Sequence, residues 1–237
     1  MSSSTQPLTW LITGASSGIG QAICKAALAA GHKVAGATRD VAKASAANPD
    51  FVARGGIWVT IDPGHPDSAA AFAAADRELG GVDVLINNAG FTGRASRGAY
   101  AASKWASEAM HEVLSREVGD KLGIKVLIVE PGAFRTTFTS RGVVDATVNE
   151  AYKGTELDTA ITMVSNWNED GFNKYFRGDT AKAARAILNA IVDGHDGYLR
   201  LVLGPDCVAA MEQKIGELQR DLDATREVSM STNLDDA

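Results

Sequence analysis

The chain has 237 residues, of which 45% are hydrophobic, and it carries a formal net charge of −6. This length suits one α/β domain with a sizeable core, and the scattered basic residues favour neither nucleic acid nor an anionic membrane as a partner. No apolar run is long enough to span a bilayer and residues 1–7 lack the pattern of a signal peptide, so we expect a cytoplasmic protein.

Short β-rich runs alternate with helical patterns along the chain, which predicts βαβ units and a parallel sheet. The strands are expected at Leu8–Thr13, Lys33–Thr38, Ile57–Ile61, Val82–Asn87, Lys125–Glu130 and Tyr198–Leu203. The helices are expected at Gly18–Ala30, Ser68–Leu79, Tyr100–Val118, Thr180–Val192 and Val208–Arg226. In the last helix apolar residues recur at helical spacing, which predicts that it lies on the body of the domain.

The whole chain, residues 1–237, is predicted to form a single domain. Residues 142–178 have weak periodicity and contain several aromatic residues, among them Tyr152, Trp167, Phe172 and Tyr175. A long, irregular, partly apolar segment of this kind is typical of a substrate lid, and ordinary surface packing is the alternative. Residues 228–237 are expected to be a disordered tail.

The most informative stretch runs from Thr13 to Gly20, between an expected buried strand and an expected helix. Glycine lets the backbone approach phosphates closely, and the first-turn N–H groups and the dipole of the helix favour negative charge. This order predicts a site for a dinucleotide pyrophosphate at Gly14, Ser16, Ser17, Gly18, Ile19 and Gly20. Because any tight strand-to-helix turn favours glycine, the stretch alone leaves a purely structural turn open.

Tyr100 and Lys104 are four residues apart in an expected helix, so their side chains share one face. A free phenol has a pKa of about 10, and a nearby ammonium lowers that pKa by favouring the phenolate. The pair therefore predicts a catalytic tyrosine that exchanges a proton with a substrate oxygen, with Lys104 activating it. The alternative is an ordinary helix pair.

Four segments in order carry a family resemblance: the glycine turn, Asn87-Asn88-Ala89-Gly90, the Tyr100-to-Lys104 segment and Pro131-Gly132-Ala133-Phe134-Arg135-Thr136. Together they resemble the short-chain dehydrogenase/reductase family, from about Leu8 to about Asp235. The resemblance implies a single Rossmann-like, doubly wound parallel sheet in the α/β class. It also implies that Asp62, Asn88, Ala89, Tyr100, Lys104, Pro131, Gly132 and Thr136 line the site of a nicotinamide cofactor. For Asp62, a turn aspartate before Pro63 is the alternative.

The charge at the end of the second expected strand indicates which cofactor binds. An acidic residue there would bind the ribose 2′-hydroxyl of NAD, whereas this chain has Arg39, which suits a 2′-phosphate. Ser17 adds a donor from the glycine turn. We therefore expect NADP(H), with pairing of Arg39 to Asp40 or to solvent as the alternative.

Nine residues separate Gly90 from Tyr100, where family members place a helix and a strand. In those members the strand carries the catalytic serine, at a spacing that here leads back to Asn87 and Asn88. The chain therefore lacks that serine, and we expect its sheet to have one strand fewer than the family norm. Without this helix–strand unit, the remaining connection is still an allowed right-handed crossover. The remaining strands can therefore pair in one sheet.

The sequence thus predicts an NADPH-dependent oxidoreductase that transfers a hydride between the nicotinamide and a carbonyl or secondary alcohol of an apolar small molecule. The alternative is a catalytically impaired relative that binds nucleotide or a partner protein, or a shortened isoform. A homodimer is a further expectation, because family members dimerise through the tyrosine-bearing helix. No metal site is expected, since two cysteines and four histidines show no ligand spacing.

Overall fold

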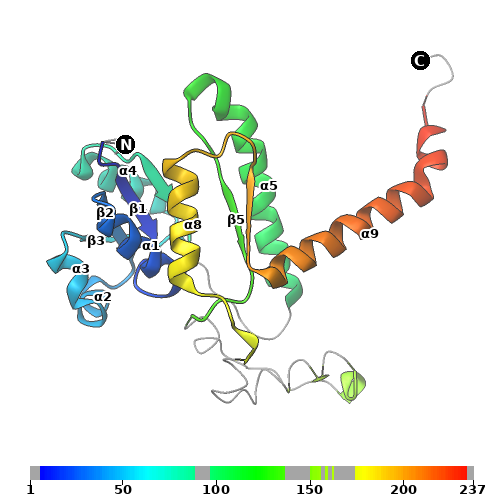
Figure 1. Cartoon of the computed structure of the whole chain (residues 1–237), viewed down its shortest axis with the longest axis horizontal. Coiled ribbons are helices and arrows are strands. Elements are labelled where there is room, and N and C mark those ends of the chain that lie inside the picture. Colours follow the sequence, from blue (N-terminus) through cyan, green and yellow to red (C-terminus); the bar gives the residue numbers. More distant parts are fainter. Residues whose placement is uncertain are drawn as a thin grey trace.

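The computed structural model in Figure 1 describes residues 6–88, 97–136, 150–155, 158–159, 162 and 174–233, with residues 97–99 and 120–121 described by their backbone alone. The strands are β1 Thr9–Thr13, β2 Lys33–Thr38, β3 Ile57–Thr60, β4 Val84–Ile86, β5 Ile128–Pro131 and β6 Arg200–Leu203. The helices are α1 Gly18–Ala29, α2 Val41–Ala47, α3 Pro49–Ala53, α4 Ser68–Leu79, α5 Arg97–Leu122, α8 Thr180–Val192 and α9 Pro205–Met230, with a short 3₁₀ helix at Glu150–Tyr152.

The α/β class and the parallel pairing are as predicted, and each expected strand and helix is present within a few residues of its predicted ends. Helices α2 and α3 were not predicted. Helix α2 begins where the Asp40 side chain accepts a hydrogen bond from the Lys43 N–H, and α3 begins at Pro49, a residue favoured in a first helical turn. Both are short, so their apolar periodicity is too brief to be recognised in the sequence.

The strands divide between two sheets, one with the order β3-β2-β1-β4 and one formed by β5 and β6. From the sequence we expect a single sheet in which the later strands pair beside the earlier ones. Among the described residues β4 and β5 are not paired, so this pairing does not occur. The β5–β6 pair is instead held by helices on its two faces, through side-chain packing and ion pairs.

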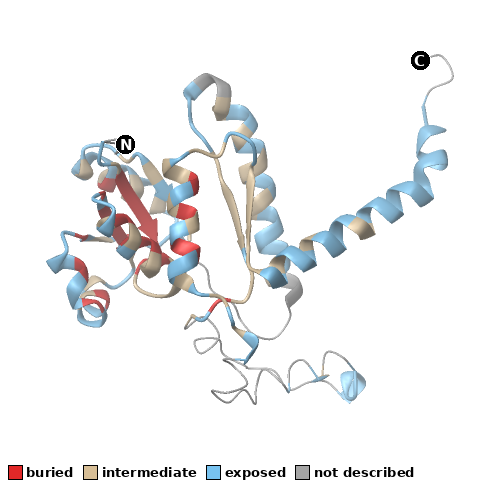
Figure 2. Cartoon of the chain, in the orientation of Figure 1, coloured by how far each residue is buried: buried red, intermediate tan, exposed pale blue. Residues whose placement is uncertain are grey.

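Helix α8 joins the two sheets on one face. A single hydrophobic cluster contains Trp10 and Ile12 of β1, Ile23 and Ala27 of α1, and Ala184 and Ile187 of α8, each at most 3% exposed. Residues from β4, β5 and β6 pack on the same cluster: Val84, Ile86, Val129, Leu201 and Leu203. Figure 1 shows α8 standing between the four-stranded sheet and the β5–β6 pair, and Figure 2 shows buried residues along α8.

On the opposite face of the four-stranded sheet, helices cover only part of the strands. Helix α4 packs against β1 and β2 through a second cluster that includes Leu11, Ala35 and Ala75. Leu85 of β4 is the direct neighbour of Leu11 in the parallel register, yet it is 56% exposed whereas Leu11 is 2% exposed. Strands of such sheets are normally covered on both faces. The cover therefore ends at β4, beside the place where the sheet is divided.

Helix α9 does not lie on the body of the domain, contrary to the sequence expectation. It runs from Pro205 to Met230, beyond both ends of the predicted 208–226 helix, and none of its residues is buried. Residues 228–230, assigned to a disordered tail, belong to this helix, while residues 234–237 lie outside the described part. Figures 1 and 2 show α9 projecting away from both sheets with exposed residues along its length. Its apolar residues therefore lack the cover that the core provides elsewhere.

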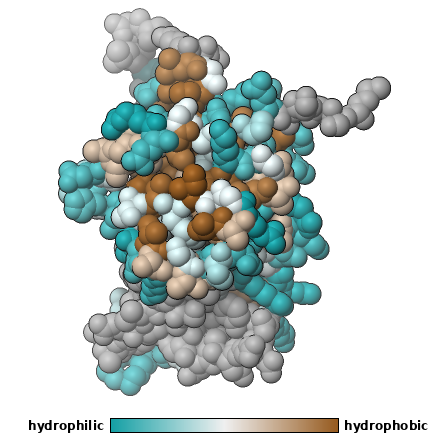
Figure 3. All heavy atoms as spheres, turned by 90° about the vertical axis from the view of Figure 1, so that its left-hand side faces the viewer, coloured by the Kyte–Doolittle hydropathy of each residue, from teal (hydrophilic) through white to brown (hydrophobic). Residues whose placement is uncertain are grey.

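The far edge of the larger sheet is formed by β3, on the side that faces the viewer in Figure 3. Hydrophobic surface gathers in the middle of this face among hydrophilic residues. Val52 of α3 and Ile57 of β3 are both more than half exposed. In the described part of the chain no helix has the length and apolar character needed to cross a bilayer.

Because Leu11 is buried and Leu85 is half exposed, we expect truncation of the two side chains to lower the free energy of unfolding by different amounts. Leu11→Ala should lower the free energy of unfolding by about 2–5 kcal/mol, because it opens a cavity in a packed core. Leu85→Ala should lower it by less than about 1 kcal/mol, because that side chain is half in water. Urea unfolding of both variants measures the difference, and equal costs would contradict the exposed position of Leu85.

Candidate functional site

The glycine turn after β1 has the backbone that the sequence predicted. Gly14 and Gly18 adopt φ angles of +62° and +60°, in the left-handed region that favours glycine. A Cβ at Gly20 would lie 2.5 Å from both the Gly14 carbonyl oxygen and Asn88 Nδ2, so the turn and the next strand approach too closely for a side chain. Ser17 precedes α1 in an extended conformation. Helix α1 thus begins directly after a turn in which the glycines leave the backbone accessible.

Asn88 holds this turn in place from the end of β4. Its side-chain Nδ2 donates to the Thr13 carbonyl at 3.0 Å and to the Gly14 carbonyl at 3.4 Å. Its backbone N–H donates to Thr13 Oγ1 at 2.9 Å, and that hydroxyl donates to the Ile86 carbonyl at 3.3 Å. The carboxyl ends of β1 and β4 are therefore joined by side chains as well as by the strand ladder. Ala89, a predicted site residue, lies outside the described residues.

Asn48 is a second support of the turn, and it is not among the site residues predicted from the sequence. Its Nδ2 donates to the Ser16 carbonyl at 3.2 Å and to the Ala44 carbonyl at 3.0 Å, and the residue is 8% exposed. Gln21 Nε2 also donates to Asn48 Oδ1. The available sequence signal was an asparagine directly before Pro49, which reads as a turn. Ile19, predicted to bind cofactor, packs its partly buried side chain against the core cluster.

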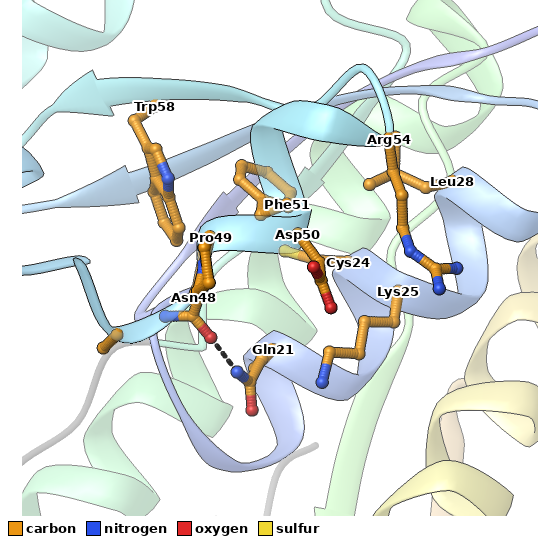
Figure 4. Close-up of a pocket in the computed structure, with 12 residues that line it drawn as sticks. Gln21, Cys24, Lys25, Leu28, Asn48, Pro49, Asp50, Phe51, Arg54 and Trp58 are labelled. Carbon is orange, nitrogen blue, oxygen red and sulfur yellow. Dashed lines mark hydrogen bonds between the residues drawn. The ribbon is translucent and has the colours of Figure 1, made fainter. Parts of the chain in front are cut away.

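A cavity of about 240 Å³ lies behind this support, between α1, α3 and β3. Figure 4 shows Gln21 and Asn48 joined at its edge, with Lys25, Asp50 and Arg54 around its opening and Phe51 and Trp58 beyond. None of the predicted site residues lines it. It is therefore separate from the proposed cofactor side of the turn.

Residues after β5 meet the glycine turn although they follow a different sheet. A Cβ at Gly18 would lie 3.3 Å from Thr136 Cβ, which places Thr136 against the turn, while its part in binding the cofactor stays a prediction. Before it, the Gly132 N–H donates to the Leu203 carbonyl at 2.8 Å and the Ala133 N–H donates to Asp206 Oδ2 at 2.6 Å. A Cβ at Gly132 would collide with that carboxylate. The Pro131–Gly132 segment is thus bound by β6 and the first turn of α9.

The end of the predicted lid is fixed to the same segment. Phe134 forms a parallel bridge with Gly178, and Arg135 Nε donates to the Phe176 carbonyl at 2.8 Å. Trp167 and Phe172 lie outside the described residues, while Tyr152 and Tyr175 are about half exposed. The structure therefore anchors one end of residues 142–178, and their role as a lid stays a prediction.

Tyr100 and Lys104 share a face of α5, with Lys104 Nζ 5.8 Å from the centre of the Tyr100 ring. Burial raises the pKa of Tyr100 above its ordinary value of 10.0. The prediction from the sequence was that the Lys104 ammonium lowers this pKa. The direction is opposite because the phenol is partly removed from water, and burial disfavours the charged phenolate.

Helix α5 is held to the β5–β6 pair by Arg200. Its Nε donates to Glu108 at 2.8 Å and its Nη2 donates to Glu112 at 2.8 Å, while Glu130 of β5 lies 3.3 Å away without hydrogen-bond geometry. The hydrogen bond from Arg200 lowers the pKa of Glu112, and burial raises the pKa of Glu130. This cluster was not recognised in the sequence, because its residues are up to 92 positions apart. It positions the helix that carries Tyr100.

The two residues predicted to read the adenosine half are both exposed. In the described part of the chain no acidic side chain lies within ion-pair distance of Arg39, and the neighbouring Asp40 is engaged as the cap of α2. Asp62 Oδ1 accepts a hydrogen bond from the Gly64 N–H at 3.1 Å, which is the turn role considered as its alternative. A part in adenine recognition stays a prediction for Asp62.

Comparison with known proteins identifies the family. The sequence model described as short chain dehydrogenase matches residues 9–98 and 90–145, in two segments that overlap where the chain was expected to be short. The chain is 37% identical to "Oxidoreductase claN" of Passalora fulva over 207 positions, covering 65% of this chain and 94% of the relative. A crystal structure of a short-chain dehydrogenase from Streptomyces avermitilis is 31% identical, with a TM-score of 0.79 and coverage of 97% of this chain and all of that one. The chain belongs to the short-chain dehydrogenase family.

Two further comparisons bear on the departure from the family and on the fold. "Oxidoreductase BOA17" of Botryotinia fuckeliana is 24% identical over 278 positions, covering 94% of this chain and 98% of the relative. Because this chain has 237 residues, that alignment contains gaps of at least 41 positions in it. A Burkholderia phymatum structure in complex with NAD (19% identity, TM-score 0.67, 90% and 95% coverage) and a Burkholderia cenocepacia structure in complex with NADP (22%, 0.61, 85% and 98%) share the fold.

The Arg200 cluster generates a prediction with a matched control. Arg200→Ala should lower the Tm by about 3–8 °C, because it removes the cation that Glu108, Glu112 and Glu130 share. Arg116→Ala, which removes an exposed partner of Glu112, should change it by less than about 2 °C. Because the pKa of Glu112 is lowered by folding, the difference should be present at neutral pH and should shrink as the pH falls below the ordinary glutamate pKa. Thermal unfolding at several pH values measures this, and equal shifts would contradict the anchoring role.

Proposed function

We propose that this chain is an NADP(H)-dependent oxidoreductase that transfers a hydride between the nicotinamide and a carbonyl or secondary alcohol of an apolar small molecule. Family membership supports the reaction class. The observation that carries the proposal is the meeting of the glycine turn, Asn88 and Thr136 at the carboxyl ends of β1, β4 and β5. Ligands of open α/β sheets bind at this edge.

The residues at this edge fit a dinucleotide. The turn offers bare backbone at Gly14 and Gly18 and leads into the positive end of α1, which suits a pyrophosphate. Ser16 and Ser17 would add donors, while Asn88 keeps the turn in shape. Pro131, Gly132 and Thr136 would hold the nicotinamide half. The bound cofactor would supply the hydride.

Arg39 supports the choice of NADP(H) over NAD(H). Its guanidinium is exposed after β2, and Asp40 is engaged as a helix cap, so the pairing considered as the alternative does not occur between them. A guanidinium free to bind a 2′-phosphate in a bidentate manner favours NADP(H). Solved relatives have been crystallised with either cofactor, so the family alone does not decide.

A charge reversal tests this assignment. Arg39→Asp should raise the Kd for NADPH by about ten- to hundredfold, because it removes a charge-assisted contact and adds repulsion. The Kd for NADH should not rise. Arg77→Asp on α4 is the matched control, which should leave both values unchanged. Fluorescence titration measures all four, and an unchanged Kd for NADPH in Arg39→Asp would overturn the assignment.

Tyr100 is the proposed proton donor. Because burial raises its pKa, the phenol keeps its proton at neutral pH, which suits reduction of a carbonyl, where the substrate oxygen must gain a proton. As hydride reaches the carbonyl carbon, the phenol O–H bond breaks and the new O–H bond forms on the substrate. Lys104 would then stabilise the phenolate by its positive charge.

Turnover of NADPH with a panel of aldehydes, ketones and quinones tests the reaction. We expect turnover on part of this panel, a rate that falls only in alkaline solution, and a loss of about 10² to 10⁴ in kcat in Tyr100→Phe with unchanged NADPH binding. NADPH binding without turnover on any substrate would contradict the reductase and favour a catalytically impaired relative.

A second candidate, a shortened and catalytically impaired form that binds nucleotide or a partner protein, is favoured by the exposed Leu85 beside the divided sheet. The gaps in the BOA17 alignment and the absence of the family's serine at its usual spacing also support it. Losing a hydrogen-bond donor to the reacting oxygen typically costs about 10² to 10³ in rate.

A chimera separates the two candidates. The stretch of claN between the positions aligned with Asn88 and Arg97 is inserted at the same place here, with a Gly/Ser insert of equal length as control. If the chain is a shortened form, the claN insert alone should raise the Tm and create or raise turnover. An unchanged Tm and rate would contradict the shortened form.

A further inference from the structure

Helix α9 presents an exposed apolar seam with the spacing of a coiled coil. Apolar side chains stand at alternating intervals of three and four residues, at Val208, Met211, Ile215, Leu218 and Leu222. Ile215, Leu218 and Leu222 are 59%, 54% and 48% exposed. The helix has 26 residues, so it is about 39 Å long at about 1.5 Å per residue. A repeat of 3.5 residues keeps such a seam facing one partner helix along its length.

The polar side chains of α9 that bond to one another lie beside or behind this seam. Hydrogen bonds and ion pairs join Gln213 to Glu217, Lys214 to Glu217, Gln219 to Asp223 and Arg226 to Asp223. None of these residues is on the seam. The helix therefore has one polar side that stabilises it in water and one apolar side that only another surface can cover.

The residue types and charges of the seam point to a second copy of the same helix, in parallel. With Val208 at the first heptad position, Val208, Ile215 and Leu222 occupy a. Met211 and Leu218 occupy d. β-Branched residues at two of the three a positions, with leucine at a d position, favour two parallel strands. In that arrangement Asp221 of one copy meets Arg226 of the other, across the g and e positions. Lys214 meets Gln219 in the same way, so neither pair brings like charges together.

We propose that two copies of this chain associate through α9 in a parallel coiled coil. This inference stands apart from the proposed reductase activity and requires neither cofactor nor substrate. The seam has five apolar a and d positions before Thr225 and Ser229, so the dimer should dissociate on dilution. Arg226 is able to exchange its exposed pair with Asp223 for one with Asp221 of the second copy, because such surface pairs contribute little.

Analytical ultracentrifugation of the full chain over a range of concentrations tests this proposal. We expect a monomer–dimer equilibrium in the wild type and only monomer in Ile215→Glu/Leu218→Glu, because the seam cannot bury four carboxylates. Ala210→Glu/Ala224→Glu adds the same charge to the same helix away from the seam and should keep the dimer. In thermal unfolding, both variants should show the same Tm for the body of the domain as the wild type. A monomeric wild type, or a dimer that survives in the seam variant, would overturn the proposal.

Orientation is tested by crosslinking and by charge exchange. In a Cys207→Ser background, Leu218→Cys should form an intermolecular disulfide on oxidation, because identical d residues face each other only in a parallel pair. Gln213→Cys, on the outer side, should not. Asp221→Arg should weaken the dimer by about three- to thirtyfold, and Asp221→Arg/Arg226→Asp should restore it. A dimer without the Leu218→Cys crosslink would contradict the parallel arrangement.

Discussion

The packing of α8 across two sheets is the interaction on which the rest of this structure depends. In an uninterrupted sheet, backbone hydrogen bonds would fix β4 to its next neighbour. Here the four-stranded sheet and the β5–β6 pair are joined instead by side chains of Ala184 and Ile187 packed among Trp10, Val84, Val129 and Leu201. Apolar packing is strong but non-directional, so the shapes of these side chains set the relative position of the sheets.

The geometry of the candidate site also depends on the packing of α8 across the two sheets. Thr136 follows a strand of the smaller sheet, while Gly18 and Asn88 follow strands of the larger one, and the three meet in one place. Tyr100 is tied in turn to the smaller sheet through Arg200. The distance between the glycine turn and the tyrosine is therefore set by α8 and by a cluster of charges. Misplacement by about 1 Å can cost about a hundredfold in rate, so these remote contacts matter for any chemistry at the site.

Local patterns allowed much of this to be predicted from the sequence. The apolar run before Gly14 and the alanine-rich Ser68–Leu79 segment each carry their own periodicity, and the four family motifs identified the fold. Features that depend on distant residues were not accessible. Helix α9 has an apolar stripe whether it is buried or exposed, so its pattern could not reveal that nothing in the described body covers it. The Tyr100 pKa likewise depends on burial and on where Lys104 points, which a spacing of four residues does not specify.

The order in which the chain is made has a consequence for α8. Trp10 and Ile12 leave the ribosome long before their partners Ala184 and Ile187 are synthesised. Until then the nascent N-terminal half carries an uncovered apolar face and an open strand edge at β4, features that make partly folded chains prone to aggregation. Production of this protein should therefore depend on chaperones that shield early segments, and C-terminal truncations that remove α8 should yield insoluble chains.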